Sequence, residues 1–465
     1  MKYVNILLIG LVLLFPGCTF LDVVPEGNIE SIESNFEKRD QTENWFKYCH
    51  FWVSPFTTSV ISNPAYMGTD EVVAGTYLRE SGFNWSGLYI ADGLQRTFDP
   101  FCNMWRRDAV YNSIRYCNTF LEKVWGVYNM TDAEKKLWVA EIKALKAYYY
   151  FELLRHYGPF VVMDENIDPG VPVEDMKKER SPVDVCVEEI VSLLDEAMKD
   201  LPLMKDKERS RWAYHSLESA AALKAMTLFY AASPLFNGNP AYSGFVNSKG
   251  EKLFSQQKDP EKWRYAAEAV DSALLICNRG GKYLISSESD KITDRIKDIE
   301  ASAIALNFEN AEAIYMFRYE SFVNGGWPKW TRPYFNSTDE DYNMEMKGCV
   351  APSLKMVEMY YTEHGLPIEE DKAWWKYEER YTMGTEDDKR YKDVDEKVLK
   401  LHLKREPRFY AHIAADRCYY QLGKKNVLVE AYRGERFGTR EASITNSVPQ
   451  NLTGYWMKKG SDSEV

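Results

Sequence analysis

Apolar residues recur at intervals of three and four positions over much of the chain, which is the spacing of one face of an α-helix. The first strongly periodic stretch begins near Trp105 and has apolar positions at Val110, Ile114, Cys117, Leu121 and Val124. A second stretch runs from Ala140 to Leu154 with the same spacing. We expect its helix to end at Tyr157-Gly158-Pro159, because a glycine followed by a proline stops a helix.

The same pattern predicts three further helices. In the first, Ser181 is the expected N-cap, Pro182 takes the first helical position, and Pro202 follows the last apolar residue. The second ends at Ser233-Pro234 and the third at Gly280-Gly281. Their apolar stripes are Val187, Ile190, Leu194, Ala197 and Leu201 in the first, Ala222, Ala225, Phe229 and Ala232 in the second, and Ala266, Val270, Ala273 and Cys277 in the third.

The composition of these stripes predicts how the helices pack. Alanine lets helix backbones approach closely, which favours antiparallel helix pairs stacked as in tetratricopeptide repeats. An ordinary all-α bundle is the alternative, and periodicity alone does not separate the two. Residues 50–103 and 281–350 instead carry many Gly, Asn, Ser, Pro and aromatic residues with little periodicity, as functional loops do.

We therefore expect a mainly α fold in one domain spanning residues 18–465. Its scaffold is an irregular tetratricopeptide-like array of helical hairpins, mainly within 104–280. A loop-rich second lobe is expected mainly from 50–103 and 281–465.

The first residues read as an export signal. Lys2 provides a positive start, Ile6 to Phe15 form an apolar stretch, and Phe15-Pro16-Gly17-Cys18 resembles a lipobox. The apolar run is too short to span a bilayer. We expect residues 1–17 to be removed and Cys18 to be acylated, so that the mature protein is tethered to a membrane by its first residue.

Charge and motif content narrow the function classes. With 70 Asp and Glu against 58 Lys and Arg, the chain is acidic, so nucleic acid is not an expected partner. The eight cysteines form no C-x-x-C pair, and the six histidines lie in no H-E-x-x-H motif. Adjacent carboxylates such as Asp70 and Glu71 are common in a chain with 28% charged residues. We therefore expect no enzyme activity, no metal and no cofactor.

The order of motifs resembles the SusD/RagB-like lipoproteins of Bacteroidetes. Most specific is the stretch from Glu141 to Gly158, which is similar to the family signature E-x-x-x-L-R-A-x-Y-Y-F-x-L-x-x-x-Y-G. Other matching segments follow in family order over most of the chain. They are Phe20-Leu21-Asp22 with Pro25, Gly68 to Glu71, Trp105 with Tyr111, Ile114 and Asn118, Arg180-Ser181-Pro182, Ala222 to Pro234, Pro352 to Tyr360 with Gly365, and Arg405 to Arg408 with Ile413.

This resemblance implies binding without catalysis at the cell surface. Such proteins are anchored in the outer membrane, cover SusC-like TonB-dependent transporters, and capture glycans or sometimes peptides. The implied function is capture of an oligosaccharide and its delivery to the transporter. A peptide-binding or protein-interaction scaffold of the outer membrane is the alternative, and a hydrolase would need a cleft with two facing carboxylates.

The end of the sequence departs from the family pattern. After Thr453-Gly454-Tyr455 and Lys458-Lys459, family members continue into a further helix, whereas this sequence ends at Val465. We expect a truncated chain in which the partner of the absent helix exposes an apolar face.

Candidate ligand contacts lie in the two loop-rich stretches, because sugar binding needs flat rings and a few polar groups. Trp85 with Trp327 or Trp330 is the expected aromatic platform, with Arg79 and Asn84 bonding to hydroxyl groups. Burial of each tryptophan in the second lobe is the alternative. The full candidate set is Tyr77, Arg79, Asn84, Trp85, Trp327, Trp330 and Tyr334.

Overall fold

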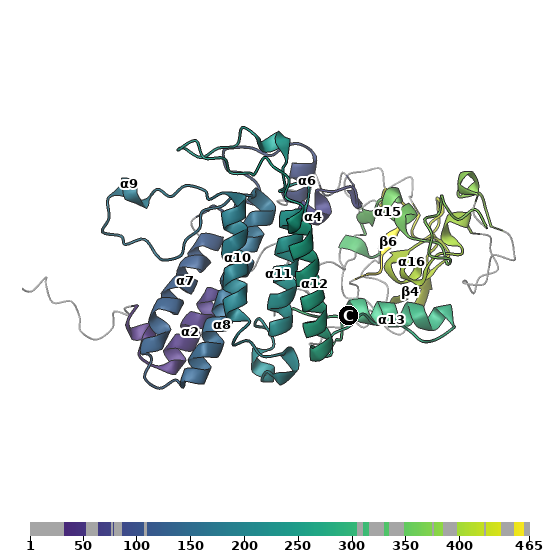
Figure 1. The fold of residues 1–465 in the computed structure, drawn as a ribbon. Coiled ribbons are helices and arrows are strands. Elements are labelled where there is room, and N and C mark those ends of the chain that lie inside the picture. Colours follow the sequence, from purple (N-terminus) through teal and green to yellow (C-terminus); the bar gives the residue numbers. More distant parts are fainter. Residues whose placement is uncertain are drawn as a thin grey trace, which may run out of the picture.

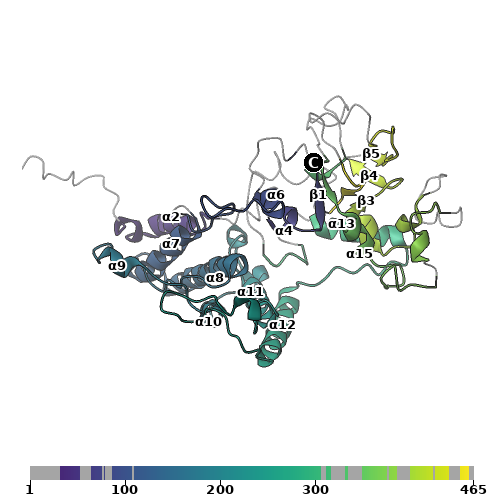
Figure 2. The same ribbon diagram turned by 90° about the horizontal axis from the view of Figure 1, so that it is seen from above.

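The computed structural model describes residues 32–52, 64–75, 78, 86–106, 109–304, 310–315, 330–333, 348–373, 376–384, 398–422, 425–438 and 451–459. Long helices from the first part of the chain lie side by side, and short helices and strands from the last part gather beside them (Figure 1). Two short helices, α4 (Pro64–Met67) and α6 (Ser86–Ala91), lie at the junction of these two parts (Figure 2). The expectation of a mainly α fold with a second lobe is confirmed.

The helical array is built by helices that each contact the next one along the chain. All five helices expected from periodicity are present, and one earlier helix joins them. The members are α2 (Arg39–Cys49), α7 (Val110–Lys123), α8 (Asp132–Tyr157), α10 (Val183–Ala197), α11 (Leu217–Ala232) and α12 (Glu261–Gly280). Short elements in the connections are η1 (Ser34–Phe36), η2 (Val124–Gly126), α9 (Val173–Met176), η3 (Met204–Asp206), η4 (Arg209–Arg211) and η5 (Pro240–Tyr242).

Two predicted helix ends are confirmed by the structure, and one predicted helix start is wrong. Helix α8 stops at Gly158, which has a φ of 69°, and α12 stops at Gly281, which is left-handed. For α10 the N-cap is Pro182 rather than the expected Ser181. The chain is still extended at this point, because the Ser181 N–H donates to the Phe160 carbonyl and the helix begins only afterwards.

The expected stripe on α11 is also partly wrong. Phe229 was placed on the buried face but is 52% exposed, and its ring packs edge-on against Trp263 of α12. Helix α11 has buried residues on more than one side, such as Ala220, Leu223 and Ala231, because both α10 and α12 pack against it. A helix that is apolar on several sides gives no unique stripe in the sequence.

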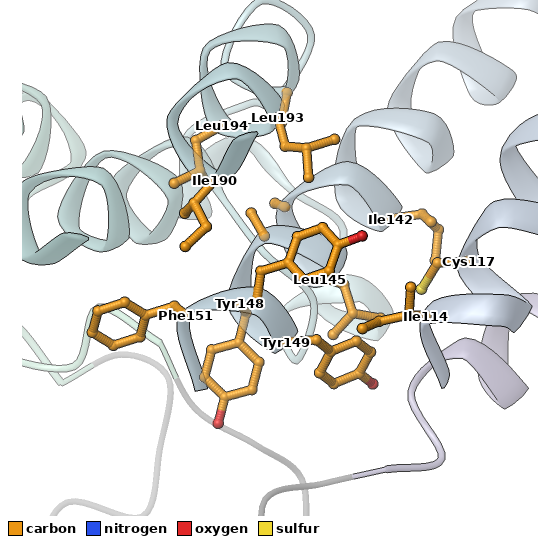
Figure 3. Packing of buried hydrophobic residues seen from close by; sticks show 14 of the residues in the cluster. Ile114, Cys117, Ile142, Leu145, Tyr148, Tyr149, Phe151, Ile190, Leu193 and Leu194 are labelled. Atoms are coloured by element: carbon orange, nitrogen blue, oxygen red, sulfur yellow. The ribbon is translucent and has the colours of Figure 1, made fainter. Parts of the chain in front are cut away.

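The main core lies between α7, α8 and α10 (Figure 3). Ile114 and Cys117 of α7 face Ile142 and Leu145 of α8, as the picture shows. Ile190, Leu193 and Leu194 project from α10 toward the same core. Every residue labelled in Figure 3 is buried, so this end of the array is a rigid support for the loops that it carries.

A charged network lies inside the array. The fully buried Glu141 carboxylate of α8 pairs with Lys207 at 2.9 Å and with Arg211. The Lys207 ammonium also donates to the carbonyl oxygens of Tyr214 at 2.8 Å and His215 at 2.7 Å. Every donor of this ammonium is therefore used, as a buried charge requires.

The second lobe contains three two-stranded antiparallel sheets among the described residues. They pair β1 (Val72–Ala74) with β2 (Val350–Pro352), β3 (Ile413–Ala414) with β6 (Trp456–Met457), and β4 (Tyr419–Leu422) with β5 (Lys425–Leu428). The helical elements of this lobe are α13 (Ile292–Ile304), α15 (Leu354–Met359), η7 (Tyr377–Glu379), η9 (Lys400–His402) and α16 (Pro407–His412).

One arginine links several segments of this lobe. The buried Arg405 guanidinium donates to the carbonyl oxygens of Leu401 at 2.7 Å, Val357 at 2.9 Å and Tyr360. It also lies over the Phe409 ring, 4.7 Å from its centroid. Burial lowers the pKa of Arg405 to about 10, so the side chain stays charged at neutral pH.

The last helix of the array carries exposed apolar side chains. Leu275 of α12 is 70% exposed, and Leu274 beside it is more than half exposed.

No helix in the described part of the chain is both long and apolar enough to cross a membrane.

Candidate functional site

Most of the predicted ligand contacts lie outside the described residues. This holds for Tyr77, Arg79, Asn84, Trp85, Trp327 and Tyr334, and for the predicted lipidation site Cys18. Their described neighbours in the sequence are Ser86, where α6 begins, and Trp330. The site is therefore built from α6, the loop that follows it, and the surroundings of Trp330.

Trp330 is buried and joins the two loop-rich stretches. Its side chain is 5% exposed and belongs to a cluster with Leu88 of α6 and Val350 of β2. Leu88 comes from the first loop-rich stretch and Val350 from the second. Trp330 cannot offer an open ring face to a ligand in this structure, so the structure corrects that part of the platform hypothesis. Its ring instead fills the core that holds the two stretches together.

Tyr89 of α6 and the loop after this helix form a stack of two half-buried rings and an exposed guanidinium. The ring of Tyr89 stacks on Phe101, with centroids 4.9 Å apart and planes 29° apart. The Arg96 guanidinium lies over the other ring of the pair, 5.0 Å from the Phe101 centroid. Phe98 at the tip of the loop is 88% exposed.

Side chains within this loop fix its shape. The Gln95 amide accepts from the Phe101 N–H at 2.9 Å and donates to its carbonyl oxygen at 3.3 Å. Arg96 donates to the Asp99 carbonyl at 2.9 Å and to its carboxylate at 3.1 Å. Asp99 itself has a φ of 52°, an uncommon value for a residue other than glycine. The bonds on either side of Asp99 hold the turn in this conformation.

The base of the loop is attached to the end of α8. The Tyr157 hydroxyl donates to the Cys102 carbonyl at 2.8 Å and accepts from the Met104 N–H at 2.9 Å. Burial raises the pKa of Tyr157, so this phenol stays protonated and remains a donor. Burial also raises the pKa of the Cys102 thiol, which makes it a poor nucleophile.

Two more tyrosines hold the neighbouring loop after α8 in the same way. Tyr111 of α7 exchanges two hydrogen bonds with the backbone of Val161, and Tyr150 of α8 exchanges two with Met163. Burial raises the pKa of both phenols, so both stay protonated. The scaffold therefore supports the loops at this end of the array through phenol contacts to their backbones.

This arrangement suits reversible binding of a polar ligand with flat apolar faces. Rings offer stacking surfaces, while guanidinium and amide groups offer hydrogen bonds. Asp70, one of the carboxylates considered for catalysis, pairs with Lys355, which lowers its pKa. Within the described ranges, no group of three or more His, Cys, Asp or Glu side chains has the geometry of a metal site.

The composition of the sequence identified the stretch that contains this loop, but the residues that form the stack were not predicted. Tyr89, Arg96, Phe98 and Phe101 all fall in or next to the predicted stretch 50–103, yet none was among the predicted contacts. The available signal was the density of aromatic and polar residues around Asp92-Gly93, a pair that favours a turn.

The sequence matches two family models. Residues 311–465 match the SusD family, and residues 56–229 match a family described as starch-binding and associating with the outer membrane. Comparison with curated protein sequences gives no significant match.

Solved structures share the fold over most of both chains. A protein named BT4246 has 24% identity and a TM-score of 0.77, over 92% of this chain and 73% of that one. A SusD-like protein from Bacteroides fragilis NCTC 9343 has 18% identity and a TM-score of 0.64, over 92% and 69%. A SusD-like carbohydrate binding protein from the same organism has 14% identity and a TM-score of 0.58, over 93% and 69%. With its helical array, its loop-rich lobe and both family matches, the chain belongs to the SusD/RagB-like family.

Proposed function

We propose that this protein is a cell-surface lipoprotein that captures an oligosaccharide and delivers it to a SusC-like TonB-dependent transporter in the outer membrane. Membership of the SusD family and the starch-binding description of the second family model support a carbohydrate ligand. One solved structure with the same fold is named as a carbohydrate binding protein. We propose binding without cleavage, because the described part of the candidate site supplies rings and hydrogen-bond donors, the groups that sugar binding needs.

The stack of Tyr89, Phe101 and Arg96 carries this proposal. A pyranose ring has an apolar C–H face that packs on an aromatic ring and hydroxyl groups that pair with polar side chains. The exposed Phe98 lies in the same loop, held open by Gln95 and Asp99. A loop fixed by its own hydrogen bonds loses little entropy when a ligand binds.

The predicted residues next to this loop complete the proposed site. Asn84 and Trp85 immediately precede α6, and Tyr77 and Arg79 lie a few residues earlier in the sequence. Trp327 and Tyr334 flank Trp330, whose cluster also contains Leu88 of α6. We assign ring contacts to Trp85 and Trp327, and hydroxyl contacts to Arg79 and Asn84. Trp330 positions these segments from the core.

Calorimetric titration against a panel of oligosaccharides tests the proposal. We expect Phe98→Ala and Trp85→Ala each to weaken binding by about tenfold or more, the effect of losing one stacking ring at a binding hot spot. Trp125→Ala is the matched control, because Trp125 is also an exposed ring but lies in η2. Equal affinities in the wild type and both site variants would remove the ring platform.

Fractionation of cells tests the anchor. Cys18→Ser removes the proposed acylation site, so the variant is expected in the soluble fraction while the wild type sediments with the outer membrane. Recovery of the two proteins in the same membrane fraction would contradict lipid anchoring through Cys18.

A peptide-binding scaffold is a second candidate, favoured by apolar surface on the array. Trp263 and Leu235 line an open pocket of about 580 Å³ between the end of α11 and the start of α12. Exposed apolar surface of this kind often contacts protein. Trp263→Ala separates the two candidates, because it weakens peptide binding under this alternative and leaves oligosaccharide affinity unchanged under the proposed function.

A further inference from the structure

The guanidinium of Arg180 contacts two aromatic rings. Its Cζ atom is 5.0 Å from the centroid of Trp105 and 5.8 Å from that of Phe245. Trp105 follows the ligand-binding loop proposed above, Arg180 precedes α10, and Phe245 belongs to the connection between α11 and α12. Three segments distant in sequence therefore meet around one side chain.

The surrounding backbone holds Arg180 in place. The next residue, Ser181, donates its N–H to the Phe160 carbonyl at 2.8 Å, and Val183 donates to the Leu253 carbonyl at 2.9 Å. The Trp105 ring stacks on Tyr111 with centroids 5.4 Å apart, and the backbone N–H of Trp105 donates to the Asn103 side-chain oxygen at 3.0 Å. The Trp105 ring and the backbone next to Arg180 are therefore both held in place by contacts with other residues.

Within the described part of the chain, no hydrogen bond or ion pair engages the Arg180 guanidinium. The acidic side chains nearest in sequence are used elsewhere, since Glu179 pairs with Lys249 and Asp184 with Lys262. Arg96 and Arg417, by contrast, each have a carboxylate partner, Asp99 and Glu435 respectively.

The geometry of a guanidinium makes this arrangement suitable for an anion. Its N–H groups all lie in the plane of the group and point outward from its edges, so contacts with the Trp105 and Phe245 rings do not use them as hydrogen-bond donors to an oxygen. An oxyanion accepts two parallel N–H groups at such an edge, which a single sugar hydroxyl does not. Arg180 remains partly exposed, so a ligand from solvent can reach it.

We propose that Arg180 recognises an oxyanion group, either a carboxylate or a sulfate, on an acidic oligosaccharide. This inference rests on the proposed function and adds the chemical class of the ligand. A glycan is favoured over a peptide because Trp105, one wall of the anion site, closely follows the loop that presents Phe98 and Phe101. One extended oligosaccharide can then contact the rings and the guanidinium together.

Calorimetry with paired oligosaccharides tests the inference on the full chain. Uronate oligomers are compared with their methyl esters, and sulfated oligomers with their desulfated forms, so that the members of each pair share their sugars and linkages and only one of them carries the anionic group. We expect one acidic member to bind about tenfold or more tightly than its neutral counterpart, the effect of one charge-assisted hydrogen-bonded pair. Arg180→Gln should abolish this preference, and Arg180→Lys should restore only part of it.

Arg279→Gln is the matched control, because it removes the same charge near the far end of α12. The start of α12 lies beside the start of α10, as the Lys262–Asp184 pair shows, and the helix then runs about 25 Å before Arg279 at 1.5 Å per residue. Phe245→Ala, which removes one ring while keeping the charge, should reduce the preference without changing the fold of the array. Far-ultraviolet circular dichroism confirms that each variant is folded.

The possible results distinguish failure of the anion site at Arg180 from failure of the proposed glycan-binding function. If neutral and acidic members bind equally, or if Arg180→Gln keeps the preference, the anion site is overturned and the glycan-binding function stands. If the wild type binds no oligosaccharide of any pair, the proposed function fails as well. If only an acidic peptide, poly-glutamate, binds in an Arg180-dependent manner, the site serves the peptide alternative and the glycan inference is wrong.

Discussion

The hydroxyl group of Tyr111 satisfies both backbone polar groups of Val161. It donates to the carbonyl oxygen at 3.0 Å and accepts from the amide N–H at 3.0 Å. Because Val161 lies in the loop after α8 and Tyr111 in α7, this one contact fixes the loop to the helical scaffold.

Tyr111→Phe removes the hydroxyl and keeps the ring. We expect it to lower the free energy of unfolding by about 1–3 kcal/mol, because the N–H and carbonyl groups of Val161 lose their partner where water has limited access. Urea denaturation measures the change. Tyr128→Phe is the control, since Tyr128 is 73% exposed and should leave stability unchanged. A Tyr111→Phe protein as stable as the wild type would show that water replaces the phenol at no cost.

Glu141→Gln breaks the buried charge network of the array. We expect a loss of about 3–5 kcal/mol in the free energy of unfolding, because Lys207 is left charged and buried without a carboxylate. Burial already lowers the pKa of Lys207, and Glu141 is the main group opposing that effect. Glu196→Gln is the control, since Glu196 forms an exposed pair with Lys143 and should cost under about 1 kcal/mol. Equal effects of the two substitutions would contradict a special role for the buried network.

Acid should destabilise the array through His50. Burial, with smaller contributions from Arg211 and Lys207, lowers the pKa of His50 to about 4. The unfolded chain takes up a proton near pH 6.5 and the folded chain only near pH 4, so unfolding becomes easier as the pH falls through this window. We expect His50 alone to account for about 3 kcal/mol of lost stability between these values.

Stability curves for the wild type and His50→Gln between pH 7 and pH 4 check this expectation. The variant should lose less stability over the window, because the substituted side chain takes up no proton. His215 is buried nearby and its pKa is also well below its ordinary value, so His215→Gln should flatten the curve in the same direction. Parallel curves for all three proteins would refute the linkage.

Arg405→Met should unfold or loosen the second lobe. The guanidinium holds the carbonyl groups of Leu401, Val357 and Tyr360, so we expect a loss of about 3 kcal/mol or more when these acceptors are left unpaired. Arg408→Met is a control within the same motif, because Arg408 is exposed and pairs at the surface with Glu406. Limited proteolysis reports the lobe directly, and equal digestion of both variants would contradict the proposed role of Arg405.

Much of the array was predictable because helix periodicity is a local signal. The stripes of α7, α8 and α10 were recognised from spacing, and Gly158 and Gly281 end their helices as expected. In the predicted stripe of α12, Ala266, Ala273 and Cys277 are buried but Val270 is 39% exposed. Helix α2 was missed, since its buried residues within Arg39–Cys49 are few and charged side chains separate them. Its position depends on contacts with α7, which no local pattern encodes.

The candidate site was predictable only as a region. The loop-rich stretch 50–103 was located from composition, but the pairing of Tyr89 with Phe101 depends on a turn that Gln95 closes through backbone contacts. Trp330 was predicted as a ligand contact but is buried, which illustrates the same limit of prediction from sequence. Without a periodic pattern, a tryptophan in a loop gives no indication of which face of the chain is buried.

The pairing of β1 with β2 also determines when this sheet can form during synthesis of the chain. The Ser353 hydroxyl bonds to the Asp70 carbonyl across 283 residues of sequence, and Val72 lies opposite Pro352. At about 5–20 residues per second, the ribosome adds the later strand some 15–60 seconds after the earlier one. The segment around Asp70 must therefore stay without these partners, and accessible to chaperones or proteases, until the ribosome has passed Ser353.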